Sequence, residues 1–537
     1  MKKSNTLLCG LLGIVTITAA PLTARAGSWQ PLNNQPPMPD ITDPQTGAFL
    51  SEGGAAFPML LTDGSVIVRN INPQQIHADA RVFKLTPDVN GSYRNGSWSE
   101  IASMPYIPIA SAQAVLADGR VIIEGGEYTG VNYDFTLTNQ GAIYDPVANS
   151  WTSVLPPPFF VDLYPPRARF APNPIGDACS VVLADGTFML QDKMSRQAAL
   201  LNLTTMTWTE TGTATKADLN DEEGWTLLPN GKVLTVDCYT DFTFGLIPHY
   251  PPHPTNSELY DPQTGTWTSA GSTINTLTDK KTAEIGPAVL RPDGTVFVVG
   301  SQGFTSIYHT NTGTWSTGPQ LPEASDGSRM TAEDAPAALL ANGNVLIAAA
   351  GGPKPPRSPY SGPPTYFFEF DGTNLIPEPT IPNAALDAGF QINLLVLPTG
   401  EILSADGSKD VEIYTPNNTT HNPNWEPVIM SAPSQVSRGG SYTITGIRFN
   451  GMSQASMYGD EGQDATNYPL VRITNLATNH VFYSRTHDHS SMAVASSALV
   501  STHFDVPSTQ ETGPSKLEVV ANGIASAAVA LSVTSGQ

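Results

Sequence analysis

The sequence predicts an all-β protein, with a ring of repeated small sheets followed by a smaller β domain. Seven copies of one hairpin pattern recur between residues 58 and 403, and the pattern has ended by residue 426. The 46 glycines and 47 prolines supply the turns that many short strands need. Only 14% of the 537 residues are charged and 40% are hydrophobic, so the composition differs from that of a disordered chain.

Each copy has an apolar run, a turn ending in glycine and a β-branched run, as in Pro58–Val68, PMLLTDGSVIV. Asp-Gly and Asn-Gly favour type I′ turns, in which both central residues have positive φ, so each copy predicts a β-hairpin. The turn glycines are Gly64, Gly119, Gly186, Gly231, Gly294, Gly343 and Gly400. Their separations of 45 to 67 residues bracket the ~50 residues of a kelch repeat.

A second hairpin follows most copies and brings a tryptophan to the start of its last strand. These tryptophans are Trp98, Trp151, Trp208, Trp267, Trp315 and Trp425, and Leu375 takes the position in the sixth copy. Two hairpins make one four-stranded blade, so the sequence predicts a seven-bladed kelch-type β-propeller over residues 27–425. The regular position indicates that the tryptophans pack between blades rather than bind a ligand. The alternative is an open sandwich or two separate β domains.

A different pattern occupies residues 426–537. Four β-rich segments without a further repeat, at 427–430, 441–446, 470–474 and 516–520, predict an immunoglobulin-like β-sandwich domain.

Residues 1–26 have the features of a secretory signal peptide. Lys2 and Lys3 precede an apolar stretch from Leu7 to Ala20, and the A-x-A site at 24–26 predicts cleavage after Ala26. The apolar stretch is shorter than the ~20 residues of a membrane span. We therefore expect a secreted or periplasmic protein. The formal net charge of -22 argues against a nucleic-acid partner.

Cleavage would remove Cys9 and leave Cys179 and Cys238. The two could pair in an exported protein, or they could be two small buried residues.

The repeats, the order of the parts and the segment SRTHDH at 484–489 resemble the galactose oxidase family. This resemblance covers nearly the whole chain after the leader and implies a copper radical oxidase of alcohols or aldehydes. In that family a Tyr-His pair opening the last blade, a histidine of the C-terminal domain and a tyrosine cross-linked to cysteine hold the copper.

Few of the family's copper residues have counterparts here. Phe390 and Gln391 stand where the family has its Tyr-His pair, and the first two blades contain no cysteine. Thr486-His487 matches the Thr-His of the family's C-terminal domain. Glutamine is a poor copper ligand and phenylalanine forms no tyrosyl radical, so a copper radical centre is not predicted.

Carboxylates take the corresponding positions in several other copies. The residues expected to line the axis or bind a ligand are Asp177, Glu222, Glu223, Glu284, Asp334 and Gln391. Crowded carboxylates need a cation, protons or positive ligand groups, and calcium suits a ring of oxygens. The alternative is that these acids are solvated or accept backbone hydrogen bonds. A further acidic group, Asp460, Glu461 and Asp464, lacks the spacing of an EF-hand loop.

Four histidines are candidate ligands of a divalent metal, either calcium or a transition metal. His487 and His489 would share one face of a strand, and His249 and His253 lie in a long loop that could cover the axis. The alternatives are solvated loop histidines and a hydrogen-bonded network that joins the two domains.

Together these features predict an exported, galactose oxidase-like kelch protein that binds a carbohydrate or polyol without copper-radical catalysis. The expected partner is a small molecule or glycan, and no membrane span is expected. Two alternatives remain open: a metal-dependent oxidoreductase of alcohols, aldehydes or sugars with an altered centre, and a structural extracellular protein.

Overall fold

The computed structural model describes residues 26–160, 173–238, 255–279, 282–352 and 361–536. Strands dominate these residues, and the helices among them are three short 3-10 turns, η1 (Pro382–Ala385), η2 (Gly389–Gln391) and η3 (Pro423–Trp425). The prediction of an all-β chain is therefore confirmed. Within these ranges no helix has the length and apolar character needed to cross a membrane.

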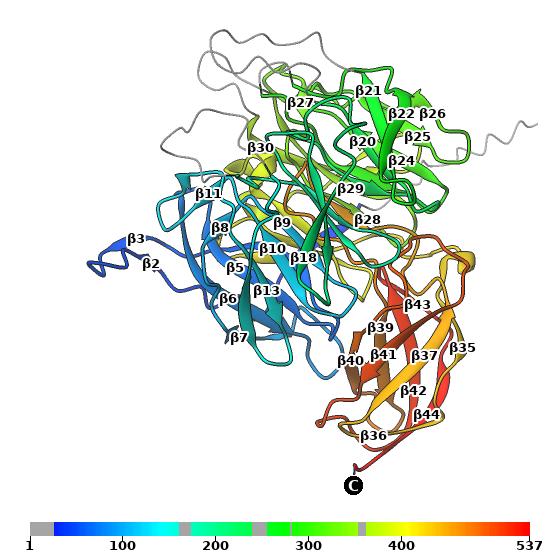
Figure 1. The fold of residues 1–537 in the computed structure, drawn as a ribbon. Coiled ribbons are helices and arrows are strands. Elements are labelled where there is room, and N and C mark those ends of the chain that lie inside the picture. Colours follow the sequence, from blue (N-terminus) through cyan, green and yellow to red (C-terminus); the bar gives the residue numbers. More distant parts are fainter. Residues whose placement is uncertain (1–25, 161–172, 239–254, 280–281, 353–360, 537) are drawn as a thin grey trace, which may run out of the picture.

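Five four-stranded antiparallel sheets follow one another along the chain (Figure 1). The strands of each sheet come from one continuous stretch of the sequence. They are β4 (Ala55–Leu60), β5 (Val66–Asn72), β6 (His77–Thr86) and β7 (Ser97–Ile101); β9 (Ala112–Val115), β10 (Val121–Glu124), β13 (Gly141–Asp145) and β14 (Ser150–Val154); β15 (Ser180–Val182), β16 (Phe188–Gln191), β17 (Ala198–Asn202) and β18 (Thr207–Thr211); β19 (Thr226–Leu227), β20 (Val233–Val236), β21 (Asn256–Asp261) and β22 (Thr266–Ser272); and β23 (Ala288–Leu290), β24 (Thr295–Val299), β25 (Thr305–His309) and β26 (Thr314–Thr317).

Two further sheets of this kind complete the series. One contains β28 (Ala337–Leu339), β29 (Val345–Gly351), β30 (Gly362–Phe370) and β31 (Leu375–Glu378), with β27 (Met330–Thr331) paired to β29. The other contains β32 (Asn393–Val396), β33 (Ile402–Ala405), β34 (Val411–Thr415) and β1 (Ser28–Pro31). First strands of neighbouring sheets contact each other, among them β9 with β15, β19 with β23, β23 with β28, β28 with β32 and β32 with β4. This is the arrangement of blades around a propeller axis.

The outer strand of the last sheet comes from the start of the chain. β1 pairs antiparallel with β34, which places Trp29 opposite Tyr414. Tyr144–Trp151, Tyr260–Trp267 and Tyr308–Trp315 are the equivalent pairs of three other sheets. The expectation that Trp425 fills this position is wrong, because Trp425 lies in η3 and Trp29 fills it instead.

The other tryptophans do begin outer strands and pack between neighbouring sheets. The indole Nε1 atoms of Trp98, Trp151, Trp208 and Trp315 donate to Asn34 O, Ala102 O, Leu155 O and Ala270 O, which lie in or beyond another strand of the ring. Trp29 Nε1 likewise donates to Pro379 O at 2.7 Å. Each of these indoles donates to a backbone carbonyl, Trp315 also to Ser257 Oγ at 3.0 Å, and packs its ring, so these residues hold sheets together.

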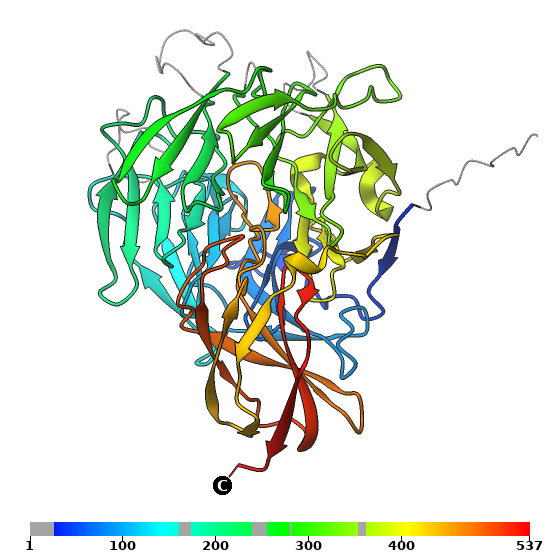
Figure 2. The ribbon, with the colours of Figure 1, turned by 90° about the vertical axis from the view of Figure 1, so that its right-hand side faces the viewer.

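The C-terminal strands form one long curled sheet, shown in yellow to red in Figure 2. Its order is β35 (Val428–Ser431), β37 (Ser441–Ile447), β41 (Val500–Asp505), β40 (Val481–His487), β39 (Leu470–Asn475), β42 (Gly513–Ala521), β44 (Val529–Thr534) and β36 (Gln435–Ser437), with β43 (Ile524–Ala525) beside β42. The first half of β40 pairs with β39 and its second half with β41. Side chains from both halves of the sheet enclose a common core that includes Ile444, Ile473, Phe504 and Leu517.

Part of the C-terminal region leaves this sheet and enters the ring. β38 (Ser456–Met457) pairs with β28, with Met457 opposite Ala337, and the residues that follow are buried. Two small sheets lie outside this scheme: a hairpin of β2 (Ile41–Thr42) and β3 (Phe49–Ser51), and a three-stranded sheet of β12 (Asp134–Phe135), β11 (Tyr128–Thr129) and β8 (Pro108–Ile109).

Candidate functional site

Sharp turns before the inner strands direct acidic side chains towards the middle of the ring. A residue with positive φ precedes five inner strands: Ala110, Gly176, Glu222, Ala283 and Asp334. Non-glycine residues in this left-handed conformation cost on the order of 1–3 kcal/mol, and such strain gathers at functional sites. Two of the four non-glycine residues, Glu222 and Asp334, are themselves acids of the site.

The C-terminal segment after β38 brings two more carboxyls to the same place. Close approach of backbones is needed here, because a Cβ on Gly459 would lie 2.4 Å from Asp334 Oδ1. The chain then delivers Asp460 and Glu461, which are 1% and 6% exposed. Hydrogen bonds on both sides hold this segment in the ring: Gly462 N donates to Ser111 O, and before β38 the side chain of Gln454 accepts from Leu227 N.

We call the resulting group the axial cluster. It contains seven carboxyls and one ammonium group: Asp177, Asp221, Glu222, Glu284, Asp334, Asp460, Glu461 and Lys193.

Lys193 follows β16 and is the cation of the cluster. Its Nζ donates to Asp177 Oδ2, lies 2.8 Å from Glu222 Oε1 and 3.2 Å from Asp221 Oδ1, and stands 3.9 Å from Asp460 Oδ2. One ammonium cannot balance seven carboxylates at short range, so further positive charge, as protons or a cation, is required.

Burial raises the pKa of most of these acids and so favours their protonated form. Burial raises the pKa of Glu461 to about 8 and, against the pull of Lys193, that of Asp177 to about 6. Burial also raises the pKa of Glu284 and of Asp334 well above the usual range. Only Glu222 is lowered, because Lys193 and neighbouring hydrogen bonds outweigh the effect of its burial on the pKa. Several carboxyls are therefore protonated near neutral pH.

The geometry of the carboxyl oxygens suits a hard cation. One ligand atom each from Asp177, Glu222 and Asp460 lie within 4.8 Å of one another, and so do those from Asp334, Asp460 and Glu461. Asp460 belongs to both groups. The buried oxygens Asp177 Oδ1 and Asp460 Oδ2 have no hydrogen-bond partner among the described residues. Oxygen-rich sites of this kind bind Ca²⁺.

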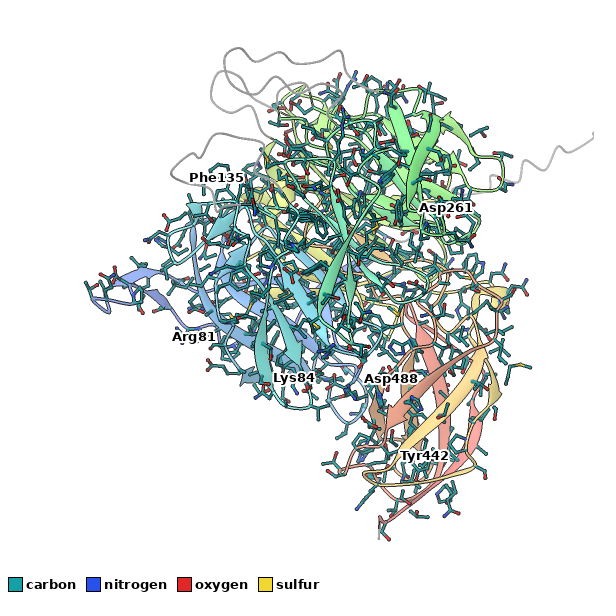
Figure 3. All side chains as sticks on the ribbon, in the orientation of Figure 1. Arg81, Lys84, Phe135, Asp261, Tyr442 and Asp488 are labelled. Carbon is teal, nitrogen blue, oxygen red and sulfur yellow. The ribbon has the colours of Figure 1, made fainter. Side chains whose placement is uncertain are left out.

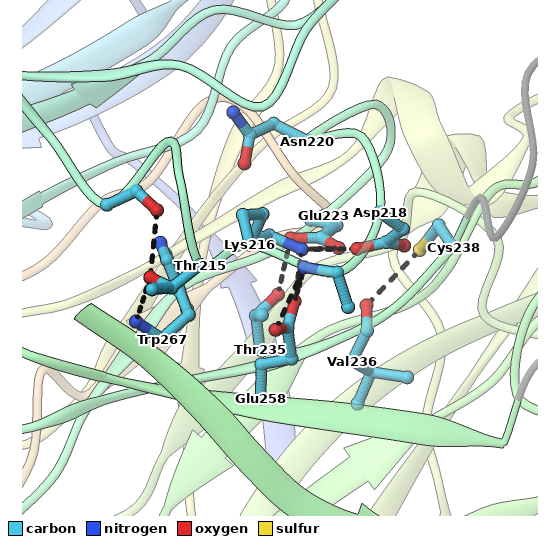
Figure 4. Close-up of polar contacts among 12 residues, drawn as sticks. Thr215, Lys216, Asp218, Asn220, Glu223, Thr235, Val236, Cys238, Glu258 and Trp267 are labelled. Atoms are coloured by element: carbon cyan, nitrogen blue, oxygen red, sulfur yellow. Dashed lines mark hydrogen bonds and ion pairs between the residues drawn. The ribbon is translucent and has the colours of Figure 1, made fainter.

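A second acidic group surrounds Lys216 (Figure 4), and Glu223 belongs to this group rather than to the axial cluster. Lys216 Nζ donates to Asp218, to Glu223 Oε1 at 2.8 Å and to Glu258 Oε2 at 2.7 Å. The lysine side chain is fully buried, and Thr235 Oγ1 donates to Glu223 as well. These contacts pair Glu223 with Lys216, and its ligand atoms group with those of Asp218 and Asp237 rather than with those of Glu222.

Gln391 and the described histidines also lie in surroundings that differ from those expected. Gln391 closes η2, where its Oε1 accepts from the backbone of Ala388. His487 lies on the C-terminal sheet against Asp488 and Asp505 and is not among the axial residues. His249 and His253 lie outside the described residues.

His487 and His489 do not face one ligand. The chain leaves the strand at Asp488, which has positive φ, and His489 is buried against Tyr468 with its Nδ1 2.8 Å from Thr502 Oγ1. Its backbone N donates to Ala117 O in the ring. His489 thus belongs to the contact between the two parts of the chain.

The described axial residues do not fit the copper centre of the resembled family. Carboxyls and one lysine provide the donors, whereas copper favours imidazole and sulfur ligands. Tyr458 is the aromatic residue of the inserted segment, but its hydroxyl donates to Phe390 O at 2.5 Å. Both cysteines are buried and free: Cys179 Sγ accepts from Trp225 N, and Cys238 Sγ donates to Glu222 O.

Comparisons with known proteins give likeness at the level of structure alone. No family model matches the chain, and no curated protein matches it. A fungal alcohol oxidase of the AA5 family in complex with copper is 16% identical, with a TM-score of 0.40, over 91% of this chain and 86% of that one. A virginiamycin B lyase from Staphylococcus aureus is 10% identical, with a TM-score of 0.44, over 72% of this chain and 99% of that one. The functional argument therefore rests on the axial residues themselves.

Sequence reasoning missed Lys193, Asp460 and Glu461 as members of the axial cluster. Lys193 follows a second strand rather than preceding a first one, so the repeat position that selected Asp177 does not select it. The run Gly459-Asp460-Glu461-Gly462 was the available signal, because glycines on both sides of two acids permit close backbone approach.

Proposed function

We propose that this chain is an exported binding protein, a seven-bladed kelch propeller followed by an immunoglobulin-like domain. Its axial cluster binds a hard divalent cation, Ca²⁺ in first place, and through it the hydroxyl groups of a carbohydrate or polyol. One observation supports this most directly: Asp460 joins two groups of three carboxyls whose oxygens lie within 4.8 Å of one another. Ca²⁺ takes 6–8 oxygen ligands, which these carboxyls and ligand hydroxyls together supply.

The exposure of the cluster is graded, and this supports a ligand on one side. Asp177, Asp460 and Glu461 are buried, whereas Glu284 and Asp334 are half-buried. A cation held by the buried acids would keep coordination positions open towards the half-buried ones. Sugar hydroxyls can donate charge-assisted hydrogen bonds to ionised carboxylates and can also offer their oxygens to a bound Ca²⁺.

The difference in burial between residues 26 and 27 also supports export. Ala26 is exposed and Gly27 is buried, and a Cβ on Gly27 would lie 2.3 Å from the hydroxyl oxygen of Tyr414. Gly27, the residue after the expected cleavage site, is thus packed against the fold, and Ala26 is not. Cleavage after Ala26 would leave β1 intact.

Calorimetric titration of the metal-free chain from Gly27 onward with CaCl2 tests the cation. We expect one Ca²⁺ per chain and the release of at least one proton, measured as a dependence of the heat on the ionisation enthalpy of the buffer. The variant Asp460→Asn/Glu461→Gln should lose binding at least tenfold, and the control Glu100→Gln, an exposed acid of β7, should not. Unchanged affinity in the double variant would overturn the assignment.

Titration with D-galactose and with glycerol then tests the ligand class. We expect binding in the presence of CaCl2 and none after its removal. Cation binding without either ligand would retain the metal site and reject the polyol assignment. Peroxide formed from alcohols or aldehydes by copper-loaded protein would instead support the oxidoreductase alternative. A double variant that is stabilised and a wild type that binds no cation would support a purely structural cluster.

A further inference from the structure

The end of β40 and the middle of β41 bring two histidines directly opposite each other. In this antiparallel pair Arg485 lies opposite Asp505 and His487 opposite His503. The two imidazole rings have centroids 5.5 Å apart and planes inclined by 24°. Because residues i and i+2 share one face of a strand, Arg485, His487, His503 and Asp505 project from the same face.

Asp488 places a carboxylate between the two rings. Its positive φ of 51° ends the strand and turns the side chain back over the pair. Asp488 Oδ2 lies 2.8 Å from His487 Nδ1 and 3.7 Å from His503 Nδ1. The ligand atoms of the three residues lie within 4.8 Å of one another. Figure 3 labels Asp488 on the C-terminal part of the chain.

We propose that His487, Asp488 and His503 form a site for a borderline divalent transition-metal ion, Zn²⁺ in first place. Two imidazole nitrogens and one carboxylate oxygen are a donor set that Zn²⁺ uses, with water at the remaining position. The site differs in chemistry from the oxygen-only axial cluster and does not depend on the proposed function of that cluster.

A second carboxylate already holds His487 in the orientation that a ligand needs. Asp505 Oδ1 lies 3.2 Å from His487 Nε2, and Asp505 Oδ2 is 3.1 Å from Arg485 Nη1. Metal-binding histidines almost always donate their other ring N–H to a carboxylate, carbonyl or water. With Nε2–H directed to Asp505, the lone pair of Nδ1 is available on the side of Asp488 and His503.

The three side chains of the site are partly exposed to solvent. The side chain of His487 is 18% exposed, and those of His503 and Asp488 are 46% and 59% exposed. Ions and water therefore reach the donors, and the two exposed side chains can approach a bound ion by simple rotation. Arg485 Nη1 pairs with Asp505 Oδ2 and its Nη2 donates to Asp118 O, so the nearby positive charge already has partners of its own.

Titration of the metal-free, untagged chain with ZnCl2 tests the proposal. We expect His487→Ala and His503→Ala each to weaken Zn²⁺ binding at least tenfold, and Asp505→Asn to weaken it roughly 10–100-fold through the orientation of His487. The matched control is His480→Ala, because His480 precedes β40 and pairs with Glu511, but belongs to none of the groups of three ligands found among the described residues. The control should bind Zn²⁺ as the wild type does.

Co²⁺ gives a second readout that does not depend on affinity alone. Co²⁺ in a site with two imidazoles and one carboxylate should show visible absorption bands that vanish in His487→Ala/His503→Ala and persist in Asp460→Asn. Equal Zn²⁺ affinity in wild type and in the double histidine variant would overturn the proposal. So would Co²⁺ bands that persist in the double histidine variant but are lost in Asp460→Asn.

Discussion

Lys193 reaches across the two parts of the chain to Asp460, with Nζ 3.9 Å from Asp460 Oδ2. The same ammonium contacts Asp177, Asp221 and Glu222 from the ring. The positive charge of the axial cluster therefore links the inserted C-terminal segment to the acids of the inner strand entries. Removal of the ammonium group should therefore weaken the contact between the inserted segment and the inner strand entries.

We expect Lys193→Met to destabilise the fold by about 3–5 kcal/mol near pH 8, since it leaves buried carboxylates without their cation. Without the ammonium, the folded-state pKa values of the acids rise further above their unfolded values, so the folded variant binds more protons. Its stability should then fall as pH rises. Urea unfolding at pH 5.5 and 8 measures this, with Lys84→Met as control. A loss of stability that is equal at both pH values would contradict the expectation.

The closing strand β1 provides a second prediction, because one tryptophan couples the two ends of the ring. The Trp29 ring lies 5.0 Å from the Tyr414 ring and 5.1 Å from that of Phe367. Trp29→Ala should cost roughly 3 kcal/mol, the lower end of the range for core Trp truncation, because Trp29 is only half-buried. Trp425→Ala, outside any sheet, should cost clearly less. Denaturant unfolding of both variants measures the difference, and an equal or reversed order would show that Trp29 does not close the ring.

The hairpins were predictable from sequence because their signals are local. An Asp-Gly or Asn-Gly turn between two apolar runs fixes a hairpin without reference to the rest of the chain, and Gly64, Gly119 and Gly294 all have positive φ. The predicted type I′ geometry is wrong, because the aspartate before each of these glycines does not have positive φ. Gly64 N donates to Leu61 O and Leu61 N to Ser65 O, as in a type I turn followed by a left-handed glycine. Asp177, Glu222 and Asp334 were found for the same reason, since each stands nine residues before its turn glycine, and Glu284 lies one residue from that position. Gln391 occupies that position too, but a 3-10 turn there directs its side chain to its own backbone.

The pairings that were missed join distant parts of the chain. β1 meets β34, and Asp460 meets Lys193, through contacts that no local period reveals. A local clue did exist for Trp29: a Ser or Thr precedes it, as it precedes Trp98, Trp151 and Trp315, whereas Asn424 precedes Trp425. His487 was a candidate metal ligand, and the structure places it on the C-terminal sheet against Asp488 and Asp505, whereas the acids Asp460 and Glu461 join the axial cluster.

A third prediction concerns the chain that begins at Gly27. Gly27 N lies 2.8 Å from Glu378 Oε2, and Glu378 is 9% exposed. Cleavage after Ala26 would turn this amide into a charged α-amino group and the hydrogen bond into an ion pair. Glu378→Gln should then destabilise the chain from Gly27 by roughly 1–3 kcal/mol. The same substitution should cost less in a chain that keeps residues 24–26.

The pH dependence of this pair has a definite sign. An α-amino group has an ordinary pKa of about 7.7–8.0, which the carboxylate of Glu378 would raise in the folded state. Its contribution should be complete below pH ~7.7 and be lost as pH rises through the raised pKa. Thermal unfolding of both chain lengths between pH 6 and 10 measures it. Identical effects of Glu378→Gln in the two chains would contradict the ion pair.

The two cysteines give a fourth prediction. Cys179 and Cys238 are buried and free, and burial raises the pKa of each thiol well above its ordinary value. Thiolates are the reactive form, so neither thiol should react with a disulfide reagent in the folded protein. Two thiols per chain from Gly27 onward should react after denaturation without reductant. A count of zero in the denatured protein would indicate a disulfide.

Glu412 of β34 provides the fifth prediction, because it is an acid buried without a cation. It is 1% exposed, and both its carboxyl oxygens have no hydrogen-bond partner among the described residues. Burial, with Asp406, Asp410 and Asp387 nearby, raises the pKa of Glu412 from 4.5 to about 8. The folded chain therefore holds a proton that the unfolded chain has released, and Glu412 makes stability fall as pH rises from about 4.5 to about 8.

Glu412→Gln removes this titration and keeps the shape of the side chain. The variant should be close to the wild type in stability at pH 5 and more stable at pH 8, by on the order of 1–3 kcal/mol. Urea unfolding at half-unit pH steps from 5 to 9 measures the two curves, and Glu100→Gln serves as an exposed control with a curve parallel to that of the wild type. Parallel curves for Glu412→Gln and the wild type would show that Glu412 is ionised in the fold and that a cation, rather than a proton, balances its charge.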